Sequence, residues 1–387
     1  MKILYILLLL FANLASAQQD GMQFGAFTVF PTLGVSYGYD DNILFTNDDL
    51  LIESSNFSVI SPGIRLETEG EKASLLLQYD YNKTLFSSNS NNNFEMHHGL
   101  ASLGYQKSSK TRFEISAEVY DGSDRRGTRN QQGDLLRLNL DPDEWNSFGL
   151  VGKWHYGGIG AKGSVDLALG FVDKNYENNR LFTFTRDRET RFFEATYGHR
   201  VSPKTQLLAQ ARLTRINYDS ANLDNDERRL MVGGEWEATG KTTARALVGY
   251  LTKSFRDGQS QGFTGLAAEV GLLYKVRSYS VVDITLNRET DETNGNGDFV
   301  LRNSLDIGWT HNWKKRLTTT LNAGRSDEDY RNNFRDDNFN HYGVSANYQF
   351  NEWLISGVSY RHMNRDSSFE EFGYDDNSVM LTLEVSK

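Results

Sequence analysis

One stretch of the sequence has the spacing of a hydrolase nucleophile. Residues 34–38 read Gly-Val-Ser-Tyr-Gly, the G-x-S-x-G pattern in which a serine stands exposed on a sharp turn between a strand and a helix. Here the stretch lies inside a segment that alternates in polarity as a strand does, so Ser36 is an ordinary polar residue of that strand. No paired Ser/His or Asp/His groups mark a membrane protease or phospholipase either, and we expect no enzyme activity and no catalytic residue.

A second pattern resembles part of a phosphate-binding loop. Residues 240–242 read Gly-Lys-Thr, but Glu235 occupies the position where that motif requires its first glycine. A turn between two strands explains these residues better. We therefore expect no nucleotide and no other cofactor.

Candidate metal ligands also lack the required arrangement. His97 and His98 are adjacent, so on a strand they point to opposite faces and cannot hold one ion without a further ligand. The acidic stretches 219–227 and 294–298 offer oxygens but not the spacing of a twelve-residue calcium loop. Solvated loops are the simpler interpretation, and we expect no metal site.

Charged residues recur on the polar side of many alternating segments. Mixed charges of this kind hydrate a pore and select its solutes. Alternatively, opposite charges pair across the interior and stiffen the wall, and the sequence leaves both interpretations open. The candidate lumen-lining residues are Arg65, Glu67, Asp80, Glu114, Glu118, Arg212, Glu235, Glu237, Asp283, Arg302, Asp306 and Arg361.

The longest polar connection, residues 121–144, is a candidate constriction loop. It carries Arg125, Arg126, Arg129 and Arg137 together with four leucines. One interpretation is that it folds inward and narrows a channel. The other is a plain hairpin above the rim, because residues 136–140 alternate as a strand extension would.

The elements that position these residues are strands. Segments of about ten to fourteen residues alternate apolar and polar side chains, as in residues 73–81, 113–119 and 379–385, and the segments are joined by short and long connections in turn. The short ones are 69–72, 107–110, 157–161, 201–205, 239–242, 276–278, 313–316 and 350–353. This rhythm predicts an all-β fold, a transmembrane antiparallel barrel of about eighteen strands, with sixteen to eighteen as the range, whose short turns face the periplasm.

Composition agrees with a barrel that is wet inside. Only 38% of the residues are hydrophobic and the mean hydropathy is −0.56, yet 12% are aromatic, which argues against disorder. The net charge of −10 argues against nucleic acid as a partner. Aromatic residues gather near the expected strand ends, where the bilayer interface would lie: Tyr37, Tyr39, Tyr105, Trp145, Trp154, Tyr156, Tyr197, Trp236, Tyr250, Tyr274, Trp313, Tyr348 and Trp353.

The N-terminus has the features of a secretory signal. Lys2 is followed by an apolar run over 3–14 and by Ala-Ser-Ala at 15–17, which predicts a signal peptide over residues 1–17 and an outer-membrane barrel over 18–387. Export through the periplasm of a Gram-negative cell follows. The chain ends Leu-Glu-Val-Ser-Lys, without the terminal aromatic residue that outer-membrane barrels commonly carry.

Two stretches resemble a known family. Residues 31–42, Pro-Thr-Leu-Gly-Val-Ser-Tyr-Gly-Tyr-Asp-Asp-Asn, and residues 61–66, Ser-Pro-Gly-Ile-Arg-Leu, are similar to the putative β-barrel porin 2 family, which includes the EpsL-like outer-membrane proteins. That family has no defined catalytic residues and is associated with exopolysaccharide or capsule operons. The resemblance implies a conduit for polysaccharide leaving the periplasm.

Three functions therefore stay open at the level of sequence. The first is a passive conduit for exopolysaccharide or capsule export, with polysaccharide and periplasmic export proteins as partners besides outer-membrane lipid and lipopolysaccharide. The second is a general or oligosaccharide-selective uptake porin. The third is a barrel enzyme or a plugged structural barrel.

Overall fold

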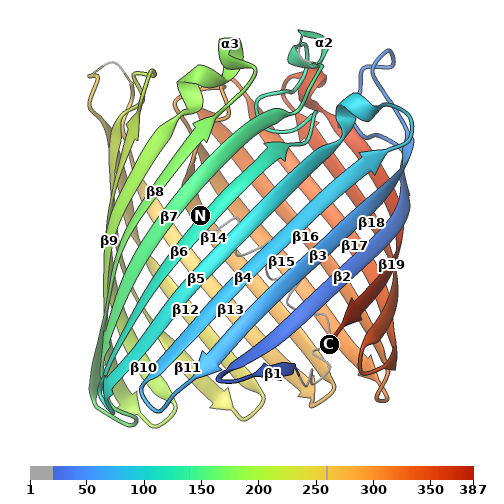
Figure 1. Ribbon diagram of the computed structural model, residues 1–387. Coiled ribbons are helices and arrows are strands. Elements are labelled where there is room, and N and C mark those ends of the chain that lie inside the picture. Colours follow the sequence, from blue (N-terminus) through green and yellow to red (C-terminus); the bar gives the residue numbers. More distant parts are fainter. Residues whose placement is uncertain (1–20, 139, 259) are drawn as a thin grey trace.

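Eighteen long antiparallel strands wind around a central axis in the computed structural model (Figure 1). The structure describes residues 21–138, 140–258 and 260–387, and the predicted signal peptide lies outside them. The strands are β2 (Phe27–Asp40), β3 (Ser55–Glu69), β4 (Ala73–Phe86), β5 (Phe94–Ser108), β6 (Thr111–Asp124), β7 (Asp143–Tyr156), β8 (Gly163–Tyr176), β9 (Arg188–Ser202), β10 (Thr205–Tyr218), β11 (Asn225–Thr239), β12 (Thr242–Phe255), β13 (Phe263–Arg277), β14 (Ser280–Glu292), β15 (Phe299–Trp313), β16 (Leu317–Arg331), β17 (Asp336–Asn351), β18 (Leu354–Ser367) and β19 (Tyr374–Ser386). A short β1 (Met22–Phe24) pairs with β2.

The barrel closes where the last strand meets the first long one. β19 pairs antiparallel with β2, from Ser378 opposite Asp40 to Ser386 opposite Thr32. Every strand from β2 to β19 therefore has two neighbours, so the wall has no edge strand. The prediction of an antiparallel barrel of about eighteen strands is confirmed.

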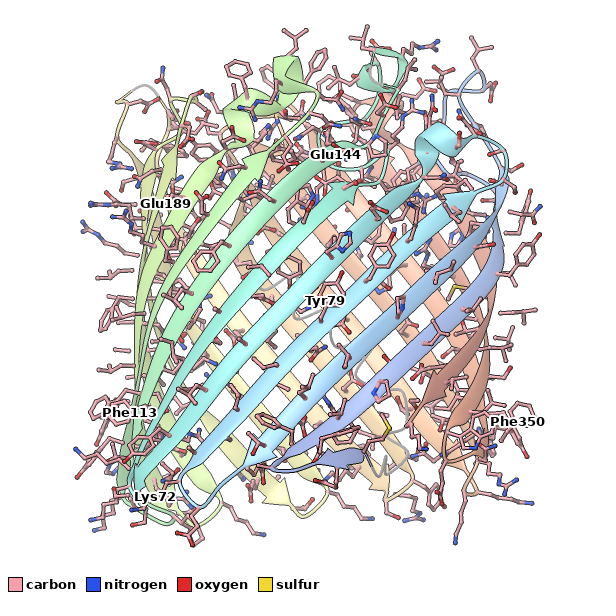
Figure 2. The ribbon with its side chains drawn as sticks, in the orientation of Figure 1. Lys72, Tyr79, Phe113, Glu144, Glu189 and Phe350 are labelled. Carbon is pink, nitrogen blue, oxygen red and sulfur yellow. The ribbon has the colours of Figure 1, made fainter. Side chains whose placement is uncertain are left out.

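The two faces of the wall have opposite character. Residues that pair directly across an antiparallel ladder point to the same side, so the register sorts each strand into two rows. On β19 the row Val379, Leu381, Leu383 and Val385 is exposed by 42% to 59%, and in Figure 2 Phe350 of β17 projects from the outside of the wall in the same way. Such a continuous exposed apolar surface suits lipid tails.

This sorting predicts the effect of a charge on each face. Leu381→Arg is expected to lower the free energy of unfolding by about 2–4 kcal/mol, because it places a cation in hydrocarbon near the middle of β19. Thr382→Arg, the neighbouring inward residue, is expected to change it far less. Denaturant unfolding of the barrel in lipid vesicles measures both, and equal losses would mean that the inside and the outside are wrongly assigned.

Short and long connections lie at opposite ends. Eight connections of two to six residues join the strands at the lower end of Figure 1, and nine of four to eighteen residues join them at the upper end. The predicted alternation is confirmed, and we take the lower end as periplasmic. The long connections hold the short helices η1 (Ser90–Asn92), α2 (Leu135–Leu138), α3 (Arg180–Thr183), η2 (Phe184–Arg186) and η3 (Glu370–Phe372). Among the described residues, no helix has both the length and the apolar character that a membrane crossing needs.

The wall bends sharply at β12, where β11 and β13 approach each other. Glycines permit this bend: a Cβ on Gly249 would lie 1.8 Å from the carbonyl oxygen of Leu230, and one on Gly233 would lie 1.8 Å from that of Ala246. The inner angle of the bend is filled by apolar side chains, namely Leu208, Met231, Leu247, Leu251 and Ala267.

Most of the aromatic residues expected at the interface lie on the outside, Trp236, Trp313 and Trp353 among them. Trp145 is the exception. It pairs with Tyr176 on the inward row, and its indole nitrogen donates to Asp124 at 2.9 Å. Its expected interfacial position is therefore wrong, because its place in the alternation points it into the barrel.

Candidate functional site

The inner wall carries all twelve charged residues that the sequence placed in the lumen. The register puts each of them on the row opposite the exposed apolar one; Asp80, for example, pairs with His98, which pairs in turn with Tyr120 of β6. Rows of this kind run through every strand from β2 to β19. Acidic residues outnumber basic ones on the inward rows.

Most of these charges pair with a neighbour in the wall. Asp80 and Glu118 flank His98, at 3.4 and 2.9 Å. The other pairs are Arg65 with Glu67 at 3.1 Å, Glu114 with Lys153 at 2.8 Å, Arg212 with Glu194 at 3.2 Å, Arg302 with Glu328 at 2.9 Å, Asp306 with His341 at 3.5 Å and Arg361 with Asp376 at 3.3 Å. Most of these pairs join residues of the same strand or of adjacent strands, and the Asp306–His341 pair reaches across Gly324 of β16, so all of them line the lumen without bridging it.

Three of the twelve residues stand apart. Within the described part of the chain, Glu235, Glu237 and Asp283 have no ion-pair partner, and all three point inward from β11 and β14. Unpaired carboxylates on a wall of mixed charge attract cations from the lumen.

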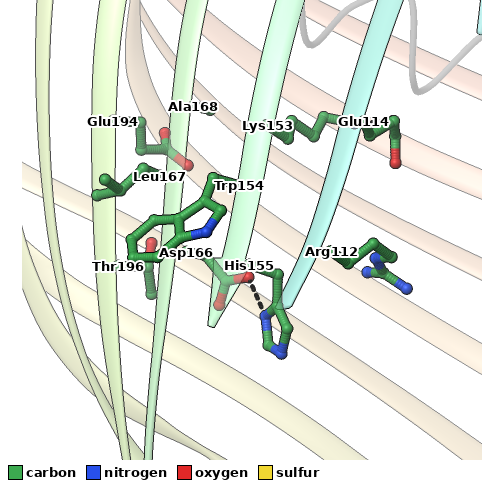
Figure 3. Close-up of a pocket in the computed structure, with 10 residues that line it drawn as sticks. All are labelled: Arg112, Glu114, Lys153, Trp154, His155, Asp166, Leu167, Ala168, Glu194 and Thr196. Carbon is green, nitrogen blue, oxygen red and sulfur yellow. Dashed lines mark hydrogen bonds and ion pairs between the residues drawn. The ribbon is translucent and has the colours of Figure 1, made fainter. Parts of the chain in front are cut away.

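The inner wall also has a recess of about 180 Å³ over β6 to β9 (Figure 3). Its polar lining alternates in sign, with Arg112, Lys153 and His155 facing Glu114, Asp166 and Glu194. The His155 imidazole contacts the Asp166 carboxylate at 2.6 Å, the dashed line in Figure 3. Donors and acceptors that alternate over a few ångströms suit the hydroxyl groups of a sugar.

Three chain segments enter the upper end of the barrel. The first is 41–54, between β2 and β3. Its residues 42–46 are almost completely buried, and Ile43 and Leu44 pack against Phe86 on the inner wall. The Asn42 side chain donates to the carbonyl oxygens of Thr46 and, across the closure seam, of Asp375, both at 2.8 Å. The segment is therefore fastened inside the mouth rather than standing above it.

The second is 125–142, the part of the candidate constriction loop 121–144 that lies between β6 and β7. Arg125 donates to the Ile43 carbonyl at 3.0 Å and to Asp40 at 3.0 Å, so it joins this segment to the first. Arg126 is buried and donates to Asn92 at 2.7 Å; burial lowers the pKa of its guanidinium. The remaining two arginines are exposed: Arg137 pairs with Asp48, and Arg129 lies in a turn with φ of +53°.

This second segment reaches the far side of the mouth. Gln132 accepts a hydrogen bond at 2.9 Å from Arg335, which lies between β16 and β17, 203 positions along the chain. Arg335 is completely buried, and its guanidinium lies 4.4 Å from the Tyr330 ring and 3.8 Å from the Phe372 ring. It also contacts Asp337 at 2.5 Å. The contact joins opposite walls and narrows the opening between them.

The third is the tip of the β14–β15 hairpin, residues 289–302. Pairing between β13 and β14 stops at Ala268 opposite Arg288, so the tip separates from β13, while β14 and β15 stay paired to Glu292 and Phe299 and β15 stays paired with β16 to Arg331. We call residues 289–302 the hairpin tip. It bends into the lumen, where Phe299 packs 5.8 Å from the Phe263 ring.

Buried charges hold the hairpin tip against the inner face of β10 to β12. Glu292 accepts hydrogen bonds from Lys253 and Tyr218, both at 2.5 Å. Lys253 has no exposed side-chain surface and also lies 3.9 Å from Glu227. From the 177–187 connection, Arg186 donates to the Thr293 carbonyl at 2.6 Å; burial lowers the pKa of Arg186 to about 10, which leaves it charged at neutral pH.

One group of acidic side chains among the described residues has the spacing that a cation would need: Asp40, Asp41 and Asp376. Each already has a polar partner, although Asp376 Oδ1 is buried without a hydrogen bond. Arg125 contacts Asp40, Arg361 contacts Asp376 at 3.3 Å, and Asn377 donates to both oxygens of Asp41, at 2.7 and 2.9 Å. These contacts link β2 to β19 at the upper end of the seam.

Comparison with known proteins decides the family. The model of the Putative beta-barrel porin 2 family matches residues 16–387. The chain belongs to this family. The resemblance seen in the first two strands is thereby confirmed over nearly the whole chain, and this family member is a porin-like barrel of the outer-membrane type. No curated protein is similar to it in sequence.

Solved structures share the fold of this family member at low identity. OccK2 (OpdF) of Pseudomonas aeruginosa superposes with a TM-score of 0.50 at 11% identity, over 93% of this chain and 98% of that one. The FrpB iron transporter of Neisseria meningitidis (F5-1 variant, apoprotein) gives 0.50 at 9% identity, over 92% and 81%. This chain spans 62% of the F3-3 variant of the same transporter. A bacterial polysaccharide outer membrane secretin gives only 0.39 at 9% identity, over 92% and 97%. These matches show the fold alone.

The residues that shape the mouth carry little signal in the sequence. Lys253, Glu292 and Arg335 lie at or beyond strand ends, where alternation carries no information about which side faces inward. The one usable signal is an unusual density of charge in residues 288–302 and 325–337.

Proposed function

We propose that this barrel is a passive conduit for an exopolysaccharide or capsule polymer across the outer membrane, narrowed at rest by its outer mouth. One observation carries the proposal: outside the apolar angle at β10 to β13, the inward rows bring hydrogen-bond donors and acceptors together along most of the wall. A hydrated sugar chain can exchange hydrogen bonds with such a wall from step to step.

Two further features support export. The recess between β6 and β9 lies in the half of the barrel nearer the short turns, where a polymer from the periplasm would enter. The three inward segments all lie at the opposite end. Such a mouth limits entry from outside and yields to a chain that periplasmic partners push outward. The family's association with exopolysaccharide operons agrees.

Removal of the gene tests the proposal. In a deletion strain, polymer is expected to accumulate in the periplasm and to fall in the medium, and the wild-type gene should restore secretion. An uptake porin predicts a different result: normal polymer yield, and loss of growth or liposome swelling with small oligosaccharides. Normal secretion in the deletion strain would rule out the export function.

The acidic lumen makes the pore prefer cations. In planar bilayers under a salt gradient, we expect a reversal potential of the sign for cation selectivity. The magnitude of this reversal potential should fall markedly in the triple variant Glu235→Gln, Glu237→Gln and Asp283→Asn, since these carboxylates have no ion-pair partner among the described residues. The control removes three acids outside the lumen, with Asp366→Asn on the outward row of β18 and with Glu71→Gln and Glu352→Gln in the short turns, and should leave the potential unchanged. An anion-selective wild-type pore would contradict the prediction.

A further inference from the structure

The periplasmic end of the barrel carries a ring of cations. Each of the eight short turns contains a lysine or arginine or lies next to one. The 352–353 turn itself has only Glu352. Lys387 lies beside this turn, since the neighbouring Ser386 donates a hydrogen bond to the Trp353 carbonyl at 3.0 Å. Figure 2 labels one member, Lys72, at the lower end. We call the ring the basic rim: Lys72, Lys110, Lys162, Lys204, Lys241, Arg277, Lys314, Lys315, Arg316 and Lys387.

These cations are exposed and uncompensated. Every member of the basic rim is exposed, and none forms an ion pair with a residue that the structure describes. The eight turns hold eight Lys or Arg against two Glu. The nine long connections at the other end hold fourteen Asp or Glu against eight Arg, and several of those arginines are buried in the mouth. The barrel is therefore positive at one end, although the whole chain has a net charge of −10.

A belt of outward aromatic residues lies next to the basic rim. Amphipathic rings of this kind settle at the level of lipid headgroups, and lysine stems are long enough to carry the ammonium group from the wall to a phosphate. The belt consists of Tyr105, Phe113, Tyr156, Tyr197, Trp236, Tyr274, Trp313, Phe350 and Trp353, all exposed by more than a third. The rim cations thus stand at headgroup depth.

The distribution of the cations around the basic rim indicates which class of molecule binds it. A docked protein would need a cluster on one sector, whereas the basic rim has a member at every turn around the barrel. An acidic polymer entering the lumen would next meet Glu67, Glu69 and Glu237 on the inward rows. Only the lipid leaflet surrounds the whole circumference.

We propose that the basic rim binds the headgroups of anionic phospholipids in the periplasmic leaflet and anchors the barrel in that orientation. This inference goes beyond the proposed transport function and does not rest on it.

The test compares lipids and charge. The full barrel is reconstituted in nanodiscs of phosphatidylcholine alone or with about one third phosphatidylglycerol, and the thermal unfolding midpoint is recorded. We expect the wild type to unfold several degrees higher with phosphatidylglycerol, and about 0.5 M salt to remove the difference. A sixfold variant that removes six of the ten rim cations should lose most of the difference between the lipids: Lys110→Gln, Lys204→Gln, Lys241→Gln, Lys314→Gln, Lys315→Gln and Arg316→Gln.

A charge-conserving variant is the matched control. Lys→Arg at the same five lysines, together with Arg316→Lys, should keep the full lipid-dependent shift. Native mass spectrometry of the wild type gives a second readout that needs no variant: phosphatidylglycerol or cardiolipin should be enriched over phosphatidylethanolamine among retained lipids. The proposal would be overturned by equal unfolding midpoints of the wild type in both lipids, or by a sixfold variant that keeps the full wild-type shift. The proposal would also be overturned if the basic rim bound a polyuronate and the barrel showed no preference between the lipids.

Discussion

Arg335→Ala is expected to raise single-channel conductance several-fold. Its guanidinium is completely buried, contacts Asp337 at 2.5 Å and donates to Gln132 at 2.9 Å. Removing one partner of such a buried pair costs about 3–5 kcal/mol, because it leaves the other charge without compensation. The strand ladder is independent of this contact, so the cost falls on the mouth, and the 125–142 segment should detach from the far wall.

The chain provides a matched control for this substitution. Arg325 and Asp327 have the same spacing in sequence and contact at 3.0 Å, but they lie on the outside with side chains 59% and 51% exposed. An exposed pair of this kind contributes at most about 1 kcal/mol. Arg325→Ala should therefore leave conductance unchanged. If folded Arg335→Ala conducts no better than Arg325→Ala, the Arg335 contact does not close the mouth.

Lys253→Met is the second large effect, and it acts on the hairpin tip. Methionine keeps much of the length of the side chain but removes the charge that faces Glu292 at 2.5 Å and Glu227 at 3.9 Å. The two carboxylates then lose the ammonium group that both of them face in a buried setting, which costs about 3–5 kcal/mol. We expect the hairpin tip to leave the wall of β10 to β12. Conductance should rise, and protease should gain access to residues 293–298.

Two variants check the cause. Lys83→Met removes a lysine that contacts Glu95 at 2.9 Å on the outer face, where both side chains are 40% exposed, and it should have little effect. Adding Glu292→Gln to Lys253→Met removes the uncompensated charge at the hairpin tip and should return conductance part of the way to the wild-type value. A double variant more open than Lys253→Met would show that repulsion between carboxylates is not what releases the tip.

The barrel and the two faces of its wall can be predicted from the order of the amino acids alone. Each strand residue faces either lipid or water, so its side chain is apolar or polar accordingly. Because successive side chains point to opposite faces, this difference repeats with period two. For this reason residues 379–385 predict an apolar row beside a polar one, and alternation alone is enough to place twelve charged residues on the inward rows. The order of short and long connections likewise indicates the strand number and the end at which each connection lies.

The shape of the outer mouth, in contrast, depends on contacts between residues that are far apart in the chain. The contact between Gln132 and Arg335 spans 203 positions and opposite walls, and no local pattern links two such residues. The hairpin tip bends inward because β13 and β14 stop pairing beyond Arg288, although β14 reads like a straight strand up to that point. Alternation reports the local environment of a single strand. It holds no information about which distant strand lies across the lumen, and buried charges such as Lys253 find their partners only there.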